Sequence, residues 1–213
     1  MSTIVFATEH DEATAANAAV ARGLVSLLDI ALIGKDATRH SLLTAMDDNR
    51  GLAVLLMAHG SREAVFENSA SHAFAVTDCE DLRGRRVFAW ACNTSLELGV
   101  AAAVAGATWI GYRCAVTAPS DHPSFLPGFC SIFAEIKSRF QYVQCAESAA
   151  DFIVWLKVEC EKLIEVFDEA LQGCDEFSAL SCCGQLWQQV DIHLPGVAAP
   201  IRHPHAPKPY LIF

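Results

Sequence analysis

The first half of the chain alternates short apolar segments with segments in which apolar residues recur at helical spacing. Residues 52–58 (LAVLLMA) are continuously apolar, which is typical of a central strand buried on both faces. Together with this segment, the apolar runs predict strands at residues 3–8, 29–34, 52–58, 86–91 and 108–112. The periodic segments predict helices at residues 11–28, 36–48 and 94–105. This order predicts an α/β fold with a mostly parallel central sheet and helices on both faces.

The pattern weakens between residues 59 and 86, where we expect an excursion from the sheet. Residues 61–77 fit a short hairpin, and residues 78–84 fit a turn or a short helix. Helical spacing returns at residues 125–140 and, over the longest such stretch, at residues 148–171. The apolar stripe of this long helix is expected to pack as part of the core.

The end of the chain is rich in proline, with Pro195, Pro200, Pro204, Pro207 and Pro209. This spacing predicts a segment that runs extended over the surface or is loosely ordered. We therefore expect a three-layer domain at residues 1–172 with extra C-terminal helices. A Pro/His-rich extension at residues 173–213 is expected to pack on this domain or to trail from it.

Composition limits the classes of protein to consider. The 213 residues, of which 53% are hydrophobic, suffice for one domain with a packed core. A formal charge of -10, from 15 basic and 25 acidic residues, disfavours binding to nucleic acids or to anionic membrane surfaces. No apolar stretch reaches the roughly 20 residues that a membrane-spanning helix needs. The N-terminus lacks the features of a signal peptide, so we expect a cytoplasmic protein.

Nine cysteines are present, an odd number with irregular spacing. Most lie in apolar segments, where a free cysteine behaves as a small hydrophobic residue. We expect free thiols in a reducing compartment. The sequence contains no G-x-G-x-x-G, Walker A, G-x-S-x-G or H-E-x-x-H motif, so nucleotide binding, serine-hydrolase chemistry and zincin chemistry lose support.

Two predicted strands run directly into residues that can carry chemistry. His59 and Gly60 follow the strand at 52–58, and Cys92 follows the strand at 86–91. Open parallel sheets place functional residues at the carboxyl ends of their strands. If the two strands are neighbours, they lie roughly 4.8 Å apart, and the imidazole and the thiol can face each other. That arrangement is a Cys-His dyad, in which the histidine activates a thiol nucleophile.

The residues around the two strand ends fit this chemistry. Thr94 and Glu97 form a T-x-x-E pattern, which predicts a capping box with Thr94 as N-cap. Cys92 is then expected near the positive end of a helix dipole, which lowers the pKa of a thiol. The backbone N–H groups of Gly60 and Cys92 are candidates for an oxyanion hole. A lone histidine or cysteine at a strand end is more often structural, and only their joint placement favours the catalytic interpretation.

The segments VLLMAHG and LRGRRVFAWACNTSLELGVAAAVAGATWIGY resemble the CHAT and caspase-like cysteine peptidases of clan CD. In that clan a strand ends in His-Gly, and the next core strand ends in the nucleophilic cysteine. The resemblance covers roughly residues 50–115, including the Ala105-Gly106-Ala107 segment before the last predicted strand. It implies a three-layer caspase-like fold and a thiol protease with His59 as base and Cys92 as nucleophile. It also implies no cofactor, a protein or peptide substrate, and regulation by a protein partner, a ligand or cleavage.

The substrate pocket departs from the family pattern. Trp90 stands two residues before the nucleophile, where caspases and metacaspases have a Gln or Asp that helps to build the S1 pocket. Trp90 is therefore a candidate substrate-binding residue, but the family's specificity does not transfer. Asp11 and Asp121, with Glu9 and Glu12, are candidates to line S1 and favour a basic P1 residue, unless they are ordinary solvated loop acids. Arg113 is the alternative, for an acidic P1 residue.

Two other interpretations remain open. The first is a catalytically silent caspase-like binding or adaptor module that uses residues 61–86 or the helix at 148–171 as an interface. The second is a metal site in the C-terminal part, where suitable ligand types gather without a C-x-x-C spacing. These ligand types are at Cys174, Cys182, Cys183, His193, His203 and His205.

Overall fold

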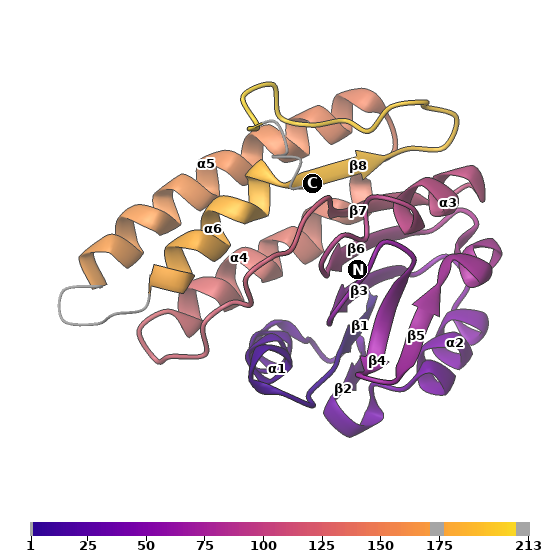
Figure 1. The fold of residues 1–213 in the computed structure, drawn as a ribbon, viewed down its shortest axis with the longest axis horizontal. Coiled ribbons are helices and arrows are strands. Elements are labelled where there is room, and N and C mark those ends of the chain that lie inside the picture. Colours follow the sequence, from indigo (N-terminus) through magenta and orange to yellow (C-terminus); the bar gives the residue numbers. More distant parts are fainter. Residues whose placement is uncertain (1, 171–176, 208–213) are drawn as a thin grey trace.

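The computed structural model describes residues 2–170 and 177–207, which form a six-stranded sheet flanked by helices (Figure 1). The strand order is β2-β1-β3-β6-β7-β8, and every pair is parallel except β7 with β8. The sheet strands are β1 (Thr3–Ala7), β2 (Ile30–Ile33), β3 (Ala53–Met57), β6 (Arg86–Trp90), β7 (Thr108–Tyr112) and β8 (Val190–His193). β4 (Ala64–Asn68) and β5 (Ser71–Ala75) form a separate antiparallel hairpin.

The connections between strands are mostly helical. The α-helices are α1 (Glu12–Leu24), α2 (Arg39–Asp48), α3 (Leu98–Val104), α4 (Leu126–Arg139), α5 (Ala146–Ala170) and α6 (Phe177–Gln188). Short 3-10 helices lie at Gly34–Asp36, Val76–Leu82 and Phe140–Tyr142. Two of the α-helices begin at residues that favour N-caps: the side chains of Asp11 and Thr38 accept hydrogen bonds from the backbone of Thr14 and Ser41.

Side chains of the parallel strands alternate between two apolar cores, one on each face of the sheet. The first core contains Val5, Leu55, Phe88, Trp90, Ile110 and Tyr112 with residues of α1, α4, α5 and α6. The second contains Ile4, Val54, Leu56, Val87, Ala89 and Trp109 with residues of α2, α3 and the hairpin. Both faces of β1, β3, β6 and β7 are therefore buried, which explains why these strand sequences are mostly apolar. The predicted α/β fold class, with helices on both faces of a mostly parallel sheet, is confirmed.

The C-terminal part contributes to the same sheet and core. α6 packs along α5, and β8 pairs antiparallel with β7 at the edge of the sheet (Figure 1). The sequence pattern did not predict α6 or β8. No helix in residues 2–170 or 177–207 is both long and apolar enough to cross a membrane.

A buried ionic cluster joins β8 to the rest of the sheet. Asp191 accepts hydrogen bonds from Arg113 (3.1 Å), from Arg202 (2.5 and 2.8 Å) and from the hydroxyl of Ser95 (2.7 Å). The side chains of Asp191 and Arg113 are each only 2% exposed. Burial raises the pKa of Asp191, but the contacts with Arg202, Ser95 and Arg113 outweigh it and hold the pKa below its ordinary value. Asp191 is therefore ionised at neutral pH and fully paired.

We expect Asp191→Asn to lower the free energy of unfolding by about 3–5 kcal/mol at pH 7, because it leaves the buried Arg113 without its counter-charge. Because the pKa of Asp191 is depressed in the folded state, its contribution is complete above about pH 4 and is lost as the pH falls through the folded-state pKa. Urea unfolding followed by circular dichroism measures both effects. The exposed Glu165→Gln is the control, with an expected change within about 0.5 kcal/mol. Equal stability of the two variants would contradict this role.

Candidate active site

β3 and β6 are neighbours, so His59 and Cys92 follow the same edge of the sheet. Met57 pairs with Trp90, and the N–H of Ala58 donates to the carbonyl of Trp90 at 3.3 Å. Gly60 lies against the backbone after β6: a Cβ atom there would meet the carbonyl oxygen of Cys92 at 2.7 Å. Only glycine allows this approach. The predicted adjacency of the two strand ends is confirmed.

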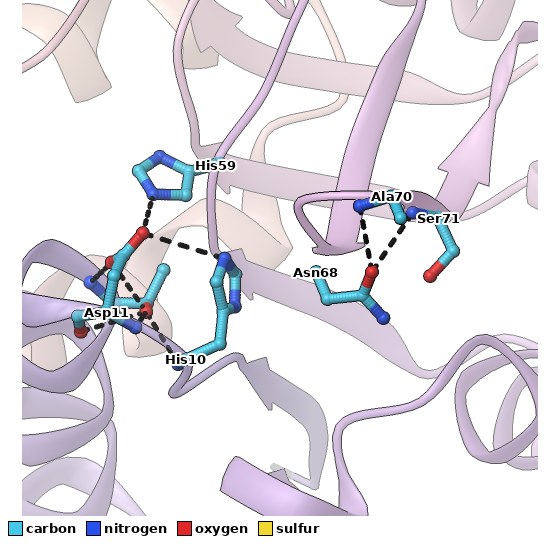
Figure 2. Close-up of polar contacts among 7 residues, drawn as sticks. His10, Asp11, His59, Asn68, Ala70 and Ser71 are labelled. Atoms are coloured by element: carbon cyan, nitrogen blue, oxygen red, sulfur yellow. Dashed lines mark hydrogen bonds and ion pairs between the residues drawn. The ribbon is translucent and has the colours of Figure 1, made fainter.

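The imidazole of His59 is held by Asp11, the last residue before α1. Nε2 of His59 lies 2.6 Å from Oδ2 of Asp11. Oδ1 of the same carboxylate accepts the backbone N–H of Thr14 at 2.9 Å and so caps the helix. Figure 2 shows the Asp11 carboxylate between the rings of His59 and His10. One oxygen of Asp11 therefore fixes the helix start, and the other is free to orient the histidine.

The Asp11 carboxylate is ionised under ordinary conditions. Partial burial raises its pKa, but hydrogen bonds from Thr14 and His59 outweigh this effect, and the pKa lies well below its usual range. An anionic acceptor at Nε2 favours the tautomer of His59 in which Nε2 carries the proton. The lone pair then resides on Nδ1, where it can accept a proton, as a general base does.

The thiol of Cys92 is half-buried and contacts the loop after β7. Its Sγ accepts the N–H of Val116 at 3.4 Å and lies 3.7 Å from the carbonyl oxygen of that residue. Within the described residues, no hydrogen bond joins this thiol to His59. The two groups share one edge of the sheet while each is held by a different neighbour. Catalytic hydrogen bonds are often long or unmade without substrate, so this arrangement is compatible with a dyad.

The turn after Cys92 differs from the predicted capping box. Residues 93–97 form turns, and α3 begins only at Leu98. Thr94 donates its hydroxyl to the carbonyl of Ala91 at 3.0 Å, and Glu97 pairs with Arg62 at 2.6 Å. The predicted N-cap at Thr94 is therefore wrong, and a helix dipole does not act on Cys92 from the predicted position. The T-x-x-E spacing is that of a capping box, but the side chain of Glu97 forms an ion pair with Arg62 in the segment after β3.

Asn93 has a left-handed backbone with φ of 60°. Among the described residues other than glycine, it is the one with positive φ. Its N–H donates to the carbonyl of Cys114 at 3.0 Å, and the N–H of Ser95 donates to that of Tyr112 at 3.0 Å. The side chain of Ser95 also bonds to the buried Asp191. The turn that presents Cys92 is thus fixed to β7 and β8, and asparagine tolerates its conformation better than most residues.

The predicted oxyanion-hole donors are the backbone N–H groups of Gly60 and Cys92. Among the described residues, no backbone or side-chain acceptor bonds to the N–H of Gly60 or of Cys92. Both residues are only partly buried. An unpaired N–H at a partly open site is available to a ligand oxygen, so the two amides stay candidates for the oxyanion hole.

An acidic cleft of about 600 Å³ lies beside the two strand ends. Asp11, Glu12 and Asp121 line it, together with Thr117 and with Ser178 from α6. Asp11 contacts His59, and Thr117 directly follows Val116, which contacts Cys92. The cleft therefore adjoins both candidate catalytic residues. Asp11 and Asp121, which are far apart in the sequence, thus line one cavity, and their role in an S1 pocket stays a prediction.

Three of the candidate substrate contacts do not line the cleft. Trp90 is 1% exposed and packs edge-on against Tyr112 and Phe133 in the core, with ring centroids 4.7 and 5.6 Å away. Trp90 follows the strand alternation to the inner face, so it cannot line a substrate pocket. Arg113 is 6% exposed and paired with Asp191, so it is not available to an acidic P1 residue. Glu9 pairs with Arg22 and does not line the cleft.

The C-terminal metal site is not formed by the described residues. Cys182 and Cys183 are fully buried in the apolar core, and Nε2 of His193 lies 3.0 Å from the Ser95 hydroxyl. Burial, foremost, raises the pKa of both thiols and lowers the pKa of His193. Cys174 lies outside the described residues. The eight cysteines within them are all free thiols, as expected.

Sequence reasoning missed the contribution of α6 to this region. Gln185 of α6 accepts the N–H of Thr117 at 2.6 Å and so fixes the loop that forms one wall of the cleft. Asp11 was predicted to bind substrate, and its hydrogen bond with His59 was not predicted. The signal for the second contact was present, because β1 and β3 end together and Asp11 stands shortly after β1.

No protein-family model matches the chain, and no curated protein matches it either.

We expect Asn93→Val to lower the free energy of unfolding by about 1–2 kcal/mol, because a β-branched residue is disfavoured in the left-handed region. Asn93→Gly should keep the stability of the parent, since glycine adopts this conformation without strain. Chemical unfolding of the two variants side by side measures the difference. The backbone interpretation fails if valine and glycine are equally stable at this position.

Proposed function

We propose that the protein is a cysteine endopeptidase in which Cys92 attacks the scissile carbonyl and His59 is the general base. The observation that carries the proposal is the convergence of three strand ends: Asp11 after β1, His59 after β3 and Cys92 after β6. The order of these strands is the one that the clan CD resemblance implies for its His-Gly and Cys segments. Asp11 is added here as a positioning residue for the histidine.

The proposed reaction proceeds through a thioester. Nδ1 of His59 takes the thiol proton as the Cys92 sulfur attacks the peptide carbonyl. The N–H groups of Gly60 and Cys92 stabilise the negative charge on the carbonyl oxygen. His59 then protonates the leaving amine, and water hydrolyses the acyl-enzyme. Asp11 holds the ring through Nε2, so the same tautomer is restored after each cycle.

The acidic cleft favours a substrate with arginine or lysine at P1. Three carboxylates, those of Asp11, Glu12 and Asp121, line this cavity beside the dyad. The chain has a net charge of -10, which adds a long-range attraction for a basic peptide. The proposed substrate is therefore a protein that is cleaved after a basic residue. A partner or ligand that changes the conformation of the loop after β7 would regulate this cleavage.

Cys92→Ala and His59→Ala are each expected to abolish cleavage of a fluorogenic peptide with arginine at P1. Asp11→Asn should lower kcat/KM for this peptide by roughly 100-fold or more, because His59 loses its orienting anion and the cleft loses one of its carboxylates. Asparagine is as good an N-cap as aspartate, so this variant keeps the start of α1. The exposed Asp48→Asn is the matched control and should keep full activity. Cleavage retained in the Cys92 or the His59 variant would reject the mechanism.

Glu12→Gln and Asp121→Asn test the substrate class. Each is expected to lower kcat/KM for arginine at P1 by roughly 10-fold, the loss of one charge-assisted contact of about 1.5 kcal/mol. Cleavage after an uncharged P1 residue should be unchanged in both variants, which separates specificity from general damage. If both variants retain the preference for arginine, the acidic cleft does not hold the P1 side chain.

The alternative function is a catalytically silent binding module, and the reactivity of Cys92 distinguishes it. Iodoacetamide should alkylate an activated Cys92 quickly at neutral pH, and His59→Ala should slow this reaction. Cys145 is exposed, and a hydrogen bond from Ser148 lowers the pKa of its thiol, so the rates are measured in a Cys145→Ser background. A slow rate that does not depend on His59 would favour the binding module.

A further inference from the structure

We propose that His10, Asp11 and His59 form a binding site for a borderline divalent transition metal such as Zn²⁺, and that the bound ion inhibits the peptidase. The inhibitory part rests on the proposed function, whereas the metal site is argued independently of it. His10 has no role in the mechanism above. It is the side chain that converts the Asp11–His59 pair into a group of three ligands.

The three side chains present their ligand atoms to one point. Oδ2 of Asp11 lies 2.6 Å from Nε2 of His59 and 3.6 Å from Nε2 of His10. One ligand atom from each residue lies within 4.8 Å of the other two. The imidazole rings are 5.5 Å apart between centroids and tilted by 60°. Figure 2 shows both rings directed at the same carboxylate from different sides.

These separations suit a small ion after a minor adjustment. With metal–ligand bonds of about 2.0–2.1 Å in a tetrahedral site, neighbouring ligand atoms lie about 3.3 Å apart. The His10–Asp11 separation of 3.6 Å is already close to this value. The His59–Asp11 separation must widen from 2.6 Å, because the metal replaces the proton between the two groups. Both rings are on side chains with solvent access, 22% and 43% exposed, so this movement is possible.

The backbone holds the ligands in place before any ion binds. His10 and Asp11 follow β1, His59 follows β3, and the N–H of Thr8 donates to the carbonyl of Met57 at 3.2 Å. The N–H groups of His10 and Asp11 both donate to the hydroxyl of Thr14 at 2.9 Å. The segment that carries two of the ligands is thus fixed to the start of α1.

The donor set indicates the class of ion. Two imidazole nitrogens and one carboxylate oxygen suit Zn²⁺ and related transition metals, whereas Ca²⁺ and Mg²⁺ prefer more oxygen ligands. Three protein ligands in a solvent-accessible site leave room for water at a fourth position.

Metal binding and base catalysis require opposite states of His59. The base needs the proton on Nε2, donated to Asp11, and the lone pair on Nδ1. A metal on Nε2 uses the lone pair of that nitrogen, so the proton of the neutral ring moves to Nδ1. The ring can then no longer accept the thiol proton of Cys92. Zinc at this site would therefore inhibit the peptidase without touching the cysteine.

The test titrates Co²⁺, a spectroscopic substitute for Zn²⁺, into the full chain and measures visible absorption, with Zn²⁺ competition for affinity. The expected result is one bound ion, displaced by Zn²⁺ and unaffected by excess Mg²⁺. His10→Ala and Asp11→Asn should each weaken binding by more than about 100-fold, because even outer partners of metal ligands are worth 10–100-fold. Cys92→Ala should bind as well as the parent. Loss of binding in Cys92→Ala, or full binding in His10→Ala, would overturn the site.

Activity is then measured with and without Zn²⁺. Since His10 lies outside the catalytic machinery, His10→Ala should cleave peptide at the parent rate and lose most of its sensitivity to Zn²⁺. Equal inhibition of the parent and His10→Ala would overturn the inhibitory role. A protein that binds Co²⁺ through these residues but cleaves no peptide would uphold the metal site and contradict the proposed function.

Discussion

The parallel pairing of β1, β3 and β6 is the constraint on which the site depends. Parallel strands end at the same edge of a sheet, so residues far apart in the sequence emerge side by side. The pairs Ala7–Met57 and Met57–Trp90 fix this register. Buried apolar residues on both faces of all three strands stabilise it, since a slip of one residue would exchange the two cores. The positions of Asp11, His59 and Cys92 follow from that packing.

Two residues with special backbone requirements, Gly60 and Asn93, shape the edge of the sheet at the site. Gly60 has no side chain, which lets its backbone lie against the carbonyl of Cys92. Asn93 adopts a left-handed conformation, and the chain can then turn back toward β7 directly after the thiol. The hydroxyl of Ser95 donates a hydrogen bond to Asp191, which links this turn to the buried ionic cluster. The turn that carries Cys92 is therefore held by hydrogen bonds to the β7 segment and to Asp191 of β8.

The sequence predicted the elements whose pattern is strong and local. The continuous apolar run of β3 and the apolar periodicity of α1 and α5 identified them, and the strand ends at His59 and Cys92 followed. The sequence pattern did not predict β8, because apolar and polar residues alternate in its short sequence, VDIH. Asp191 and His193 are nevertheless buried, since partners from other parts of the chain satisfy them. The burial of these two side chains depends on contacts between distant segments, which the sequence pattern does not reveal. Such contacts also explain why the predicted roles of Thr94, Trp90 and Arg113 were wrong.

The central claim is that the thiol of Cys92 and the imidazole of His59 work as a pair. The most direct measurement is the site of covalent labelling by an arginyl peptide with a thiol-reactive carbonyl group, located by mass spectrometry of the intact and digested protein. We expect a single adduct on Cys92 that disappears in His59→Ala. Labelling spread over several thiols, or an adduct on Cys92 that forms equally fast without His59, would contradict it.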